Sequence, residues 1–347
     1  MTKEELLAAI ERDDTIENED LSGLDFSGLD FSGARFEKCI FQGTVFTNAK
    51  IQRTGFKGCN FRGARIEGVD LTKVIWLRID LRGAILKNSI LQKAVLSGAD
   101  LSEADLSGAD FTQAVMDNAK LENTNMSGAK LFRAMLMKAS FKGANLSGAD
   151  LSRAIFYQAD LTGAILKGAT IFKTFLRDCI LINQDFRGAS FTMSQAGGAD
   201  FKGSDFTGAD ITQTNFMNAD MSGIRLDRVK GPRAVFMDAK LPGVSLTKAD
   251  LVQSCFEGCN LTGANLSGSN LEQSMFPKSV CRGTKFVGVN LDYADFSHAD
   301  LTAADFSSAG LYRAKLHRII EDHTIWTNAN KEATLGTDPD LAEAEDM

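Results

Sequence analysis

The chain has 347 residues, and its length alone suggests two or three domains. Thirty-one glycines, four prolines and 44% hydrophobic residues exclude collagen-like and disordered chains, and the formal charge of −7 argues against nonspecific nucleic-acid binding. No apolar run is long enough to cross a bilayer, and the acidic N-terminus lacks the basic start of a secretory signal, so we expect a soluble, cytoplasmic protein.

Residues 2–12, TKEELLAAIER, predict a short helix. Thr2 and Glu5 have the spacing of a capping box, and three apolar residues share one face of the helix. The residues that follow form a repeat array, and the open end of such an array must be covered. We therefore expect residues 1–20 to form an N-terminal capping helix.

A period of five residues governs the next segment, from Leu21 to Leu316. Of the sixty positions spaced by five, 58 are Leu, Phe, Ile, Met, Trp or Cys, and the exceptions are Ala196 and Gly231. The residue two positions before each centre is Ala in 32 repeats, and 26 of the 31 glycines lie two positions after a centre, where the chain turns or needs room. This period fits neither an α-helix nor an ordinary alternating strand.

The repeated motif is A(D/N)LXX, as in ANLSGADLSRA at residues 144–154 and NLTGANLSGSNL at 260–271. It resembles the pentapeptide repeat family over residues 21–316. The resemblance implies an all-β fold, a right-handed quadrilateral parallel β-helix with four pentapeptides per coil. The central and small residues would point inward. Sixty repeats would then make about fifteen coils in one rod.

Residues 317–347 are expected to form a C-terminal cap followed by an acidic disordered tail. Ile319, Ile320, Ile325 and Trp326 are the predicted apolar anchors, and the sequence after Lys331 has the acidic, weakly hydrophobic composition of a disordered segment. The segment HRIIEDH (317–323) contains ligand-type residues, but we expect it to be a capping segment with surface histidines and not a metal site.

Six cysteines are spread through the repeats without the CxxC spacing of a zinc site. Four of them lie in the small inward position, which predicts buried, reduced thiols that fill space. Cys39 and Cys59 are twenty residues apart and would stack on successive coils. No phosphate-binding loop or nucleophile motif is present, so we expect neither a cofactor nor an enzymatic activity.

Residue numbers sorted by their remainder modulo twenty assign each repeat to one of four faces, beginning with the face of Leu21. On the fourth face the position before the centre is apolar in nine of fifteen repeats, against three, three and one on the first, second and third faces. On the third face, the position two after the centre holds a row of cations: Arg53, Lys73, Lys93, Arg133, Arg153, Lys173, Arg233 and Arg313.

This asymmetry predicts a protein-binding surface at the edge between the third and fourth faces, over residues 71–180. Extended backbone favours β-branched residues everywhere, but the other faces share the backbone without sharing the preference. An apolar band bordered by cations is typical of a protein interface. The predicted site residues are Ile75, Leu77, Val95, Val115, Phe132, Arg133, Met135, Met137, Arg153, Ile155, Tyr157, Phe172, Lys173 and Phe175.

We therefore predict a rigid, non-enzymatic protein-binding scaffold whose partner the sequence does not identify. Self-association through the same strip, as in a homodimer, is a second use. The first thirty or so residues resemble the opening of pentapeptide repeat proteins of bacterial type VI secretion clusters, which would imply an adaptor role toward effectors.

The resemblance also brings a DNA-mimic alternative, the quinolone-resistance members of the family that bind DNA gyrase. Their acidic rods resemble DNA. Here each end of the chain contributes −6, so the repeats themselves carry +5, which argues against that reading. Ala196 and Gly231 mark either packing adjustments, with a neighbouring Phe in each gap, or a bend or groove.

Overall fold

Parallel backbone ladders with a spacing of twenty residues form the framework of the protein. In the computed structural model, which describes residues 1–347, Asp20 bridges Ile40 and Ile40 bridges Asn60, and the same step recurs along the chain. The chain therefore returns to the same place in the same direction after four pentapeptides. This confirms the predicted pentapeptide repeat fold with parallel stacking.

Few of these ladders are long enough to be continuous strands. β1 (Thr15–Glu17), β2 (Arg35–Glu37) and β3 (Gly55–Lys57) form one parallel sheet in the order β1-β2-β3. Elsewhere each pentapeptide turns after every centre, so neighbouring coils are joined by single bridges.

The inward positions are those that the period predicts. All sixty central residues from Leu21 to Leu316 are buried. The 26 glycines two positions after a centre all have positive φ, between 62° and 82°. Glycine adopts this left-handed conformation without steric cost, which explains its place in the turn.

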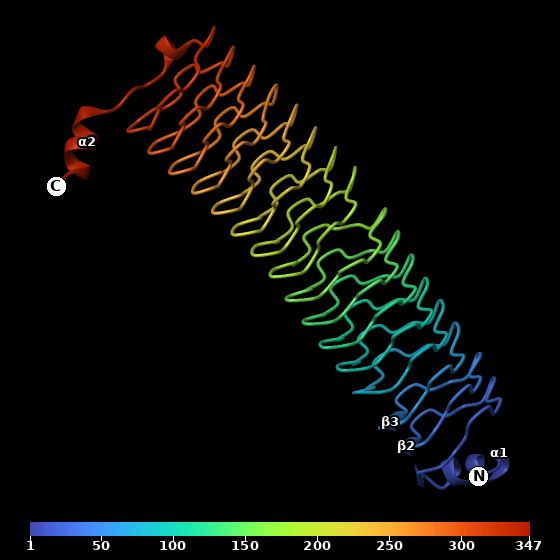
Figure 1. Ribbon diagram of the computed structural model, residues 1–347. Coiled ribbons are helices and arrows are strands. Elements are labelled where there is room, and N and C mark those ends of the chain that lie inside the picture. Colours follow the sequence, from blue (N-terminus) through green and yellow to red (C-terminus); the bar gives the residue numbers. More distant parts are fainter. The chain divides into compact units, whose positions relative to one another are not determined.

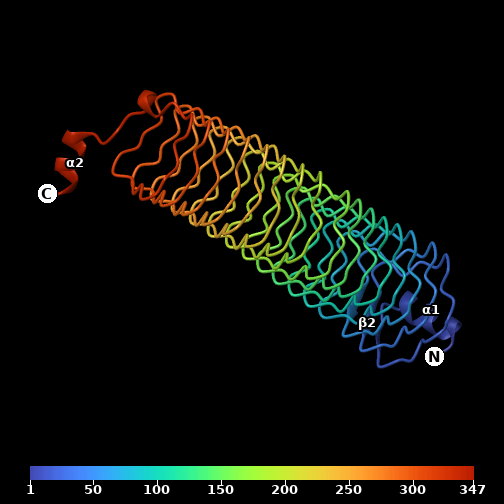
Figure 2. The ribbon, with the colours of Figure 1, turned by 45° about the horizontal axis from the view of Figure 1, so that its top comes forward.

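The chain forms two units, Met1–Phe175 (unit 1) and Leu176–Met347 (unit 2). In each unit the ribbon winds through stacked coils (Figures 1 and 2). The continuous rod of fifteen coils stays a prediction. Neither helix of the structure is long and apolar enough to cross a membrane.

Helix α1 (Lys3–Glu11) lies at the N-terminal end of unit 1 (Figure 1). The predicted capping box is present, because the Thr2 side chain accepts from the Glu5 N–H and the Glu5 carboxylate accepts from the Thr2 N–H. Leu6 of the helix is fully buried. The ladder begins earlier than predicted, since β1 carries the buried Ile16 in register with Phe36.

Unit 2 ends differently from the expected apolar cap. Ile320 and Ile325 are 55% and 46% exposed, because both occupy the outward position before a centre and continue the ladder from Asp300 and Asp305. Of the predicted anchors, Trp326 packs on the core, with its ring stacked 4.6 Å from that of Phe306.

The tail after Lys331 is structured, which corrects the expectation of disorder. It contains a 3-10 helix, η1 (Lys331–Ala333), and helix α2 (Pro339–Glu345), which is seen at the C-terminal end in Figure 2. The Asp338 side chain caps α2 by accepting from two backbone N–H groups, and Pro339 stands in the first turn, where its missing N–H is no loss. These local signals outweigh the acidic composition.

Candidate protein-binding surface

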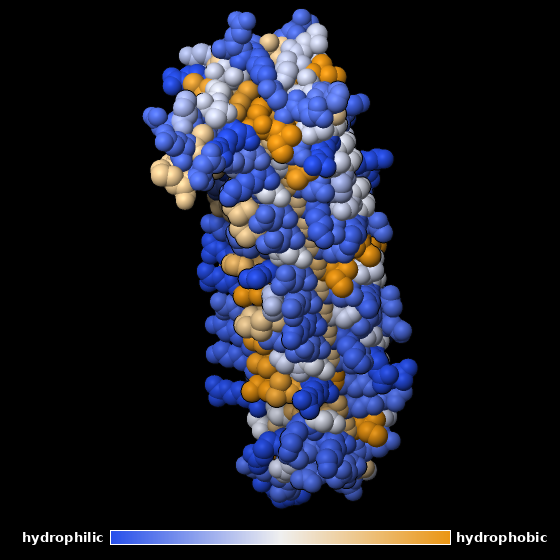
Figure 3. Space-filling model, turned by 60° about the vertical axis from the view of Figure 1, so that its left-hand side comes forward, coloured by the Kyte–Doolittle hydropathy of each residue, from blue (hydrophilic) through white to orange (hydrophobic).

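Six outward residues of unit 1 form a continuous apolar ladder. Bridges join Ile75 to Val95, and the same pairing continues through successive coils as far as Phe175. The ends of the ladder are the most exposed, with Ile75 61% and Phe175 46% accessible, and the four residues between them are partly buried. In Figure 3 the part of unit 1 that faces the viewer shows a column of orange and tan atoms with blue atoms on both sides.

From Val95 to Phe175 the backbone of this ladder is used within the fold. The Met135 N–H donates to the Ala114 carbonyl (2.9 Å), and the Met135 carbonyl accepts from the Met116 N–H (2.7 Å). The same pattern holds at Val115 and Ile155. The core is supplied by the inward residues, so the outward side chains are not needed to complete either the ladder or the core.

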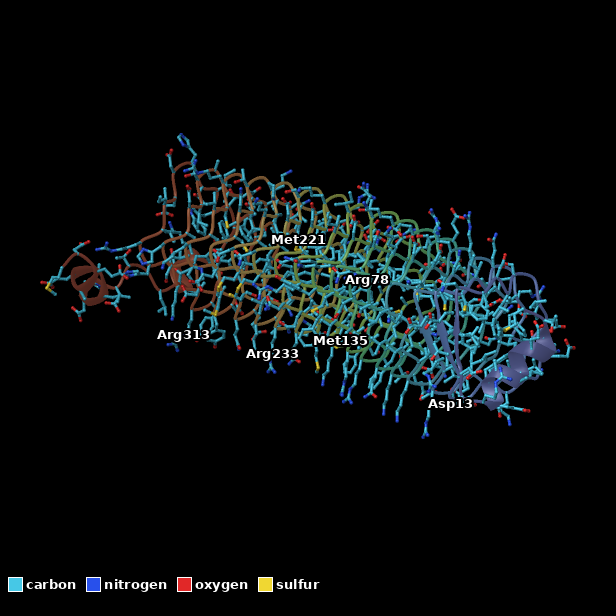
Figure 4. The ribbon with its side chains drawn as sticks, turned by 90° about the horizontal axis from the view of Figure 1, so that it is seen from below. Asp13, Arg78, Met135, Met221, Arg233 and Arg313 are labelled. Carbon is cyan, nitrogen blue, oxygen red and sulfur yellow. The ribbon has the colours of Figure 1, made fainter.

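The row of cations stands beside this ladder on the third face. Its members in unit 1 occupy the turn position at positive φ, for example Arg133 at 57° and Lys173 at 53°. None of the six takes part in an ion pair, although unit 1 forms such pairs elsewhere, as between Lys57 and Glu37. Figure 4 shows nitrogen-tipped side chains projecting from the edge beside Met135.

Two aromatic residues, Phe132 and Phe172, make cation–π contacts with three of the cations. The Arg133 and Arg153 guanidinium carbons lie 5.2 and 5.9 Å from the centre of the Phe132 ring. The Lys173 ammonium lies 5.1 Å from the centre of the Phe172 ring. These cation–π contacts hold the charged groups over the surface while leaving them without a counter-ion.

The structure brings the predicted site residues together along one edge. Leu77, 52% exposed, and the partly buried Met137 and Tyr157 follow the ladder on its other side. Sequence reasoning missed two further cations there, Arg78 and Lys138. Both stand at positive φ in the fourth-face turn, and the same sorting by face would have found them.

One carboxylate lies within the strip. The Asp117 side chain accepts from the Met137 N–H (2.9 Å) and so satisfies a backbone donor of the next coil. The strip thus contains one acid against eight cations along its two flanks, with no ion pair among them.

The carboxylates of the repeat motif have a structural role. Asp70 accepts from the Thr72 N–H (2.9 Å), and the same contact recurs at most positions where Asp or Asn precedes a centre, for example at Asp110 and Asp150. A hydrogen bond from the Thr72 side chain outweighs burial and lowers the pKa of Asp70. These carboxylates serve as turn caps, and none of them forms an ion pair with the row of cations on the third face in unit 1.

The cysteines lie where the register predicts. All six are reduced, five are buried, and the outward Cys255 is partly exposed. Cys39 and Cys59 donate to the carbonyls of Ile16 and Phe36. Burial raises the pKa of the Cys281 thiol to about 12, as expected for a residue that fills space in the core.

Two histidines meet a residue that the sequence did not connect with them. The Nε2 atoms of His298 and His317 each lie 3.2 Å from the Glu345 carboxylate of α2. Hydrogen bonds from His317 and His298 lower the pKa of Glu345. The Asp338 N–H donates to His317 Nδ1 (3.1 Å), so the neutral His317 ring carries its proton on Nε2.

That proton bears on the metal-site alternative. A metal bound at His317 Nε2 would require the proton on Nδ1, where it would face the Asp338 N–H. The geometry therefore fits a hydrogen-bonded attachment of α2 and does not fit a His-His-Glu metal centre. His323 lies apart, exposed and next to Asp322.

The two gaps in the core differ from each other. At Gly231 an added Cβ would lie 2.6 Å from Ile211 and 2.9 Å from Leu251, so these aliphatic side chains, and not a Phe, fill the space. Beside the buried Ala196 a pocket of about 250 Å³ opens to the surface. Its lining residues are Arg177, Asp178, Gln195, Gly197, Gly198, Asn215, Met217 and Asn218.

The chain is similar to known proteins in its repeat sequence. No curated protein sequence is similar enough to count as a relative. HetL, a pentapeptide repeat protein involved in heterocyst differentiation regulation in Nostoc sp. strain PCC 7120, is 22% identical, over 78% of this chain and 91% of HetL, with a TM-score of 0.21. QnrB1, a plasmid-mediated fluoroquinolone resistance protein, is 23% identical, over 60% and 91%, with a TM-score of 0.30.

A pentapeptide repeat protein of the Arabidopsis thaliana thylakoid lumen is 34% identical, over 27% of this chain and 66% of its own, with a TM-score of 0.14. All these TM-scores are low, and the assignment rests on the repeat sequence itself. The family model described as pentapeptide repeats matches residues 17–43, 39–75, 59–102, 94–133, 134–171, 165–203, 185–223, 254–292 and 279–318. These matches span most of the chain, which belongs to the pentapeptide repeat family.

Proposed function

We propose that this protein is a non-enzymatic scaffold that binds a protein partner through the strip in unit 1. The strip consists of the apolar ladder from Ile75 to Phe175 and the cations that border it. The observation that carries the proposal is a ladder of six apolar side chains that the fold does not require, next to cations without counter-ions.

The isolated apolar residues on other faces show that the strip is more than a backbone preference. Ile90, 39% exposed, lies between Asp70 and Asp110, and Ile165 pairs with Asn145. Only on the fourth face of unit 1 do apolar residues follow one another through six coils. Contiguous exposed apolar area of this kind marks protein interaction sites.

The test is a triple substitution in the strip: Met135→Asp, Ile155→Asp and Phe175→Asp. The variant should melt at nearly the same temperature as the native protein but no longer capture a partner from cell lysate. Unchanged capture would overturn the surface. Sedimentation of the same variant separates a partner protein from self-association, because only a homodimer would dissociate.

An adaptor role toward type VI secretion effectors is a finer form of this proposal. It is supported by the resemblance of the first thirty or so residues, and the genes next to this one would test it. The gyrase alternative is weaker, because the repeats carry +5 and a DNA mimic requires an anionic surface.

A further inference from the structure

The backbone of the strip limits what can bind there. From Val95 to Phe175, each ladder residue already donates and accepts in the coil-to-coil hydrogen bonds, as Met135 does with Ala114 and Met116. Over these coils a partner strand finds no unpaired edge to extend, which argues against β-augmentation along this face. The partner must be recognised by its side chains.

The spacing of the ladder selects among elements that present side chains along the strip. Successive coils are about 4.8 Å apart. Side chains on one face of an α-helix recur every turn, about 5.4 Å, whereas those on one face of a strand recur about every 6.7 Å. Over the five steps from Ile75 to Phe175, a helix drifts out of register by roughly 3 Å and a strand by roughly 10 Å.

The charge of the two flanks defines the polar side of the partner. The third-face flank holds six cations without ion pairs, one in each coil from Arg53 to Lys173 except at Gln113. The opposite flank holds Arg78 and Lys138, and Asp117 is the one acid of the strip. A partner helix with carboxylates one turn apart beside its apolar stripe would place an acid near each cation.

We propose that the strip binds an amphipathic α-helix of a partner protein, about 16 residues long, with an apolar stripe flanked by Asp or Glu. This inference rests on the proposed function and names the kind of partner. The ladder from Ile75 to Phe175 contacts the apolar stripe. The cations of the third face, centred on Arg133, Arg153 and Lys173, pair with the carboxylates.

The test uses designed, fluorescein-labelled helical peptides and the full chain, with anisotropy as the measure of binding. Two peptides share one Leu stripe and differ in carrying Glu or Lys on the flanks. The Glu peptide should bind about tenfold more tightly than the Lys peptide, and added salt should reduce that difference. A Glu peptide with two central prolines, which break the helix, should bind more weakly than the intact one.

Charge reversal in the protein supplies the matched control. The variant Arg133→Glu, Arg153→Glu, Lys173→Glu should prefer the Lys peptide. A control with the same change in net charge, Arg62→Glu, Lys87→Glu, Lys167→Glu, alters exposed cations of the first and second faces and should retain the native preference.

Three outcomes contradict the inference. The proposal of an acidic helical partner is wrong if the Lys peptide binds as tightly as the Glu peptide or more tightly. It is also wrong if the proline peptide binds as tightly as the intact one, or if the control variant loses the preference for the Glu peptide to the same extent. If partner capture still depends on the strip in any of these cases, the proposed surface stands without this partner. If the triple Asp variant captures its partner normally, the surface itself fails.

Discussion

The fourth face has the same backbone in both units but different outward side chains. In unit 1 the ladder is apolar from Ile75 to Phe175, whereas unit 2 begins with Gln195 and Asn215, which hydrogen-bond to each other at 3.3 Å. The bridges that join Gln195, Asn215 and Val235 are the same as those of unit 1. The fold is therefore compatible with either apolar or polar outward side chains on this face.

The third-face turn shows the same contrast. In unit 2 the Arg233 side chain donates to Gln253 (2.8 Å), and Gln253 donates to Gln273 (2.7 Å), so these side chains satisfy one another. In unit 1 the same position holds six cations that form no ion pair, interrupted once by Gln113. A row of like charges costs stability that the glutamine row avoids, and this difference is the reason to assign unit 1 a binding role.

The inward residues should show no such contrast. Leu136 in unit 1 and Phe256 in unit 2 are both fully buried, and Phe256 stacks 4.8 Å from both Phe236 and Phe276. Leu136→Ala and Phe256→Ala should each cost about 2–5 kcal/mol in the free energy of unfolding, measured in urea. A loss in only one unit would show that the two cores are not equivalent.

An irregular centre in unit 2 should resist repair. Gly231→Leu would restore the regular pattern, but Ile211 and Leu251 already fill the space. We expect it to lower the free energy of unfolding by about 1–3 kcal/mol, through overpacking. Adding Leu251→Ala should recover part of this loss, and a stabilising Gly231→Leu would show that the gap is empty.

The two end helices should respond differently to acid. α1 is held by the buried Leu6, whereas α2 is held by Glu345, whose pKa is lowered by His317 and His298. A lowered carboxyl pKa adds stability above the ordinary value of about 4.3 and loses it as the pH falls through the lowered pKa. The protection of α2 against hydrogen exchange, taken relative to the intrinsic exchange rate at each pH, should therefore fall further on acidification than the protection of α1.

The matched variants test this cause. Glu345→Gln should already give fast exchange in α2 at neutral pH and remove the dependence on acid. Asp340→Asn removes one charge from the same helix without touching either histidine and should leave the pH dependence intact. Identical behaviour of the two variants would contradict the assigned contact.

The smallest effect should come from moving the polar pair of unit 2 into unit 1. Val115→Gln with Met135→Asn places on the strip the residue types of Gln195 and Asn215. We expect the free energy of unfolding to change by about 0.5 kcal/mol or less, since outward positions do not build the core. A loss near that of Leu136→Ala would mean that the strip holds the fold together.

The five-residue period was sufficient to predict the inward residues, the turn glycines and the asymmetric edge. Each of these depends on neighbours at a fixed spacing of five or twenty residues, which the sequence displays directly. Contacts that do not follow this spacing are not predicted by the repeat. Glu345 meets His298 across 47 residues because α2 folds back, and no period signals it.

The two ends of the array also differ from the prediction. At the N-terminal end the ladder begins before Leu21, and at the C-terminal end the tail contains helices. Ile16 already continues the register, but it lies among acidic residues that obscure the motif. Hydrophobicity alone predicts Ile320 and Ile325 as buried anchors, but their place before a centre makes them outward. The space left by the missing side chain at Gly231 is filled by neighbouring side chains. The repeat pattern does not indicate which neighbours fill it.

We propose that the strip of unit 1 serves binding and not folding. The most direct test is to measure both properties on one preparation of the triple variant Met135→Asp, Ile155→Asp, Phe175→Asp. Stacked aspartates at this position are tolerated elsewhere, as between Asp80 and Asp100. Trp76 is buried in unit 1, and with Trp326 of unit 2 replaced by Phe its fluorescence reports unfolding there.

We expect an unfolding free energy within about 1 kcal/mol of the native value, together with loss of binding to the Glu peptide. A variant that unfolds much more readily, or one that binds the peptide as the native protein does, would contradict it.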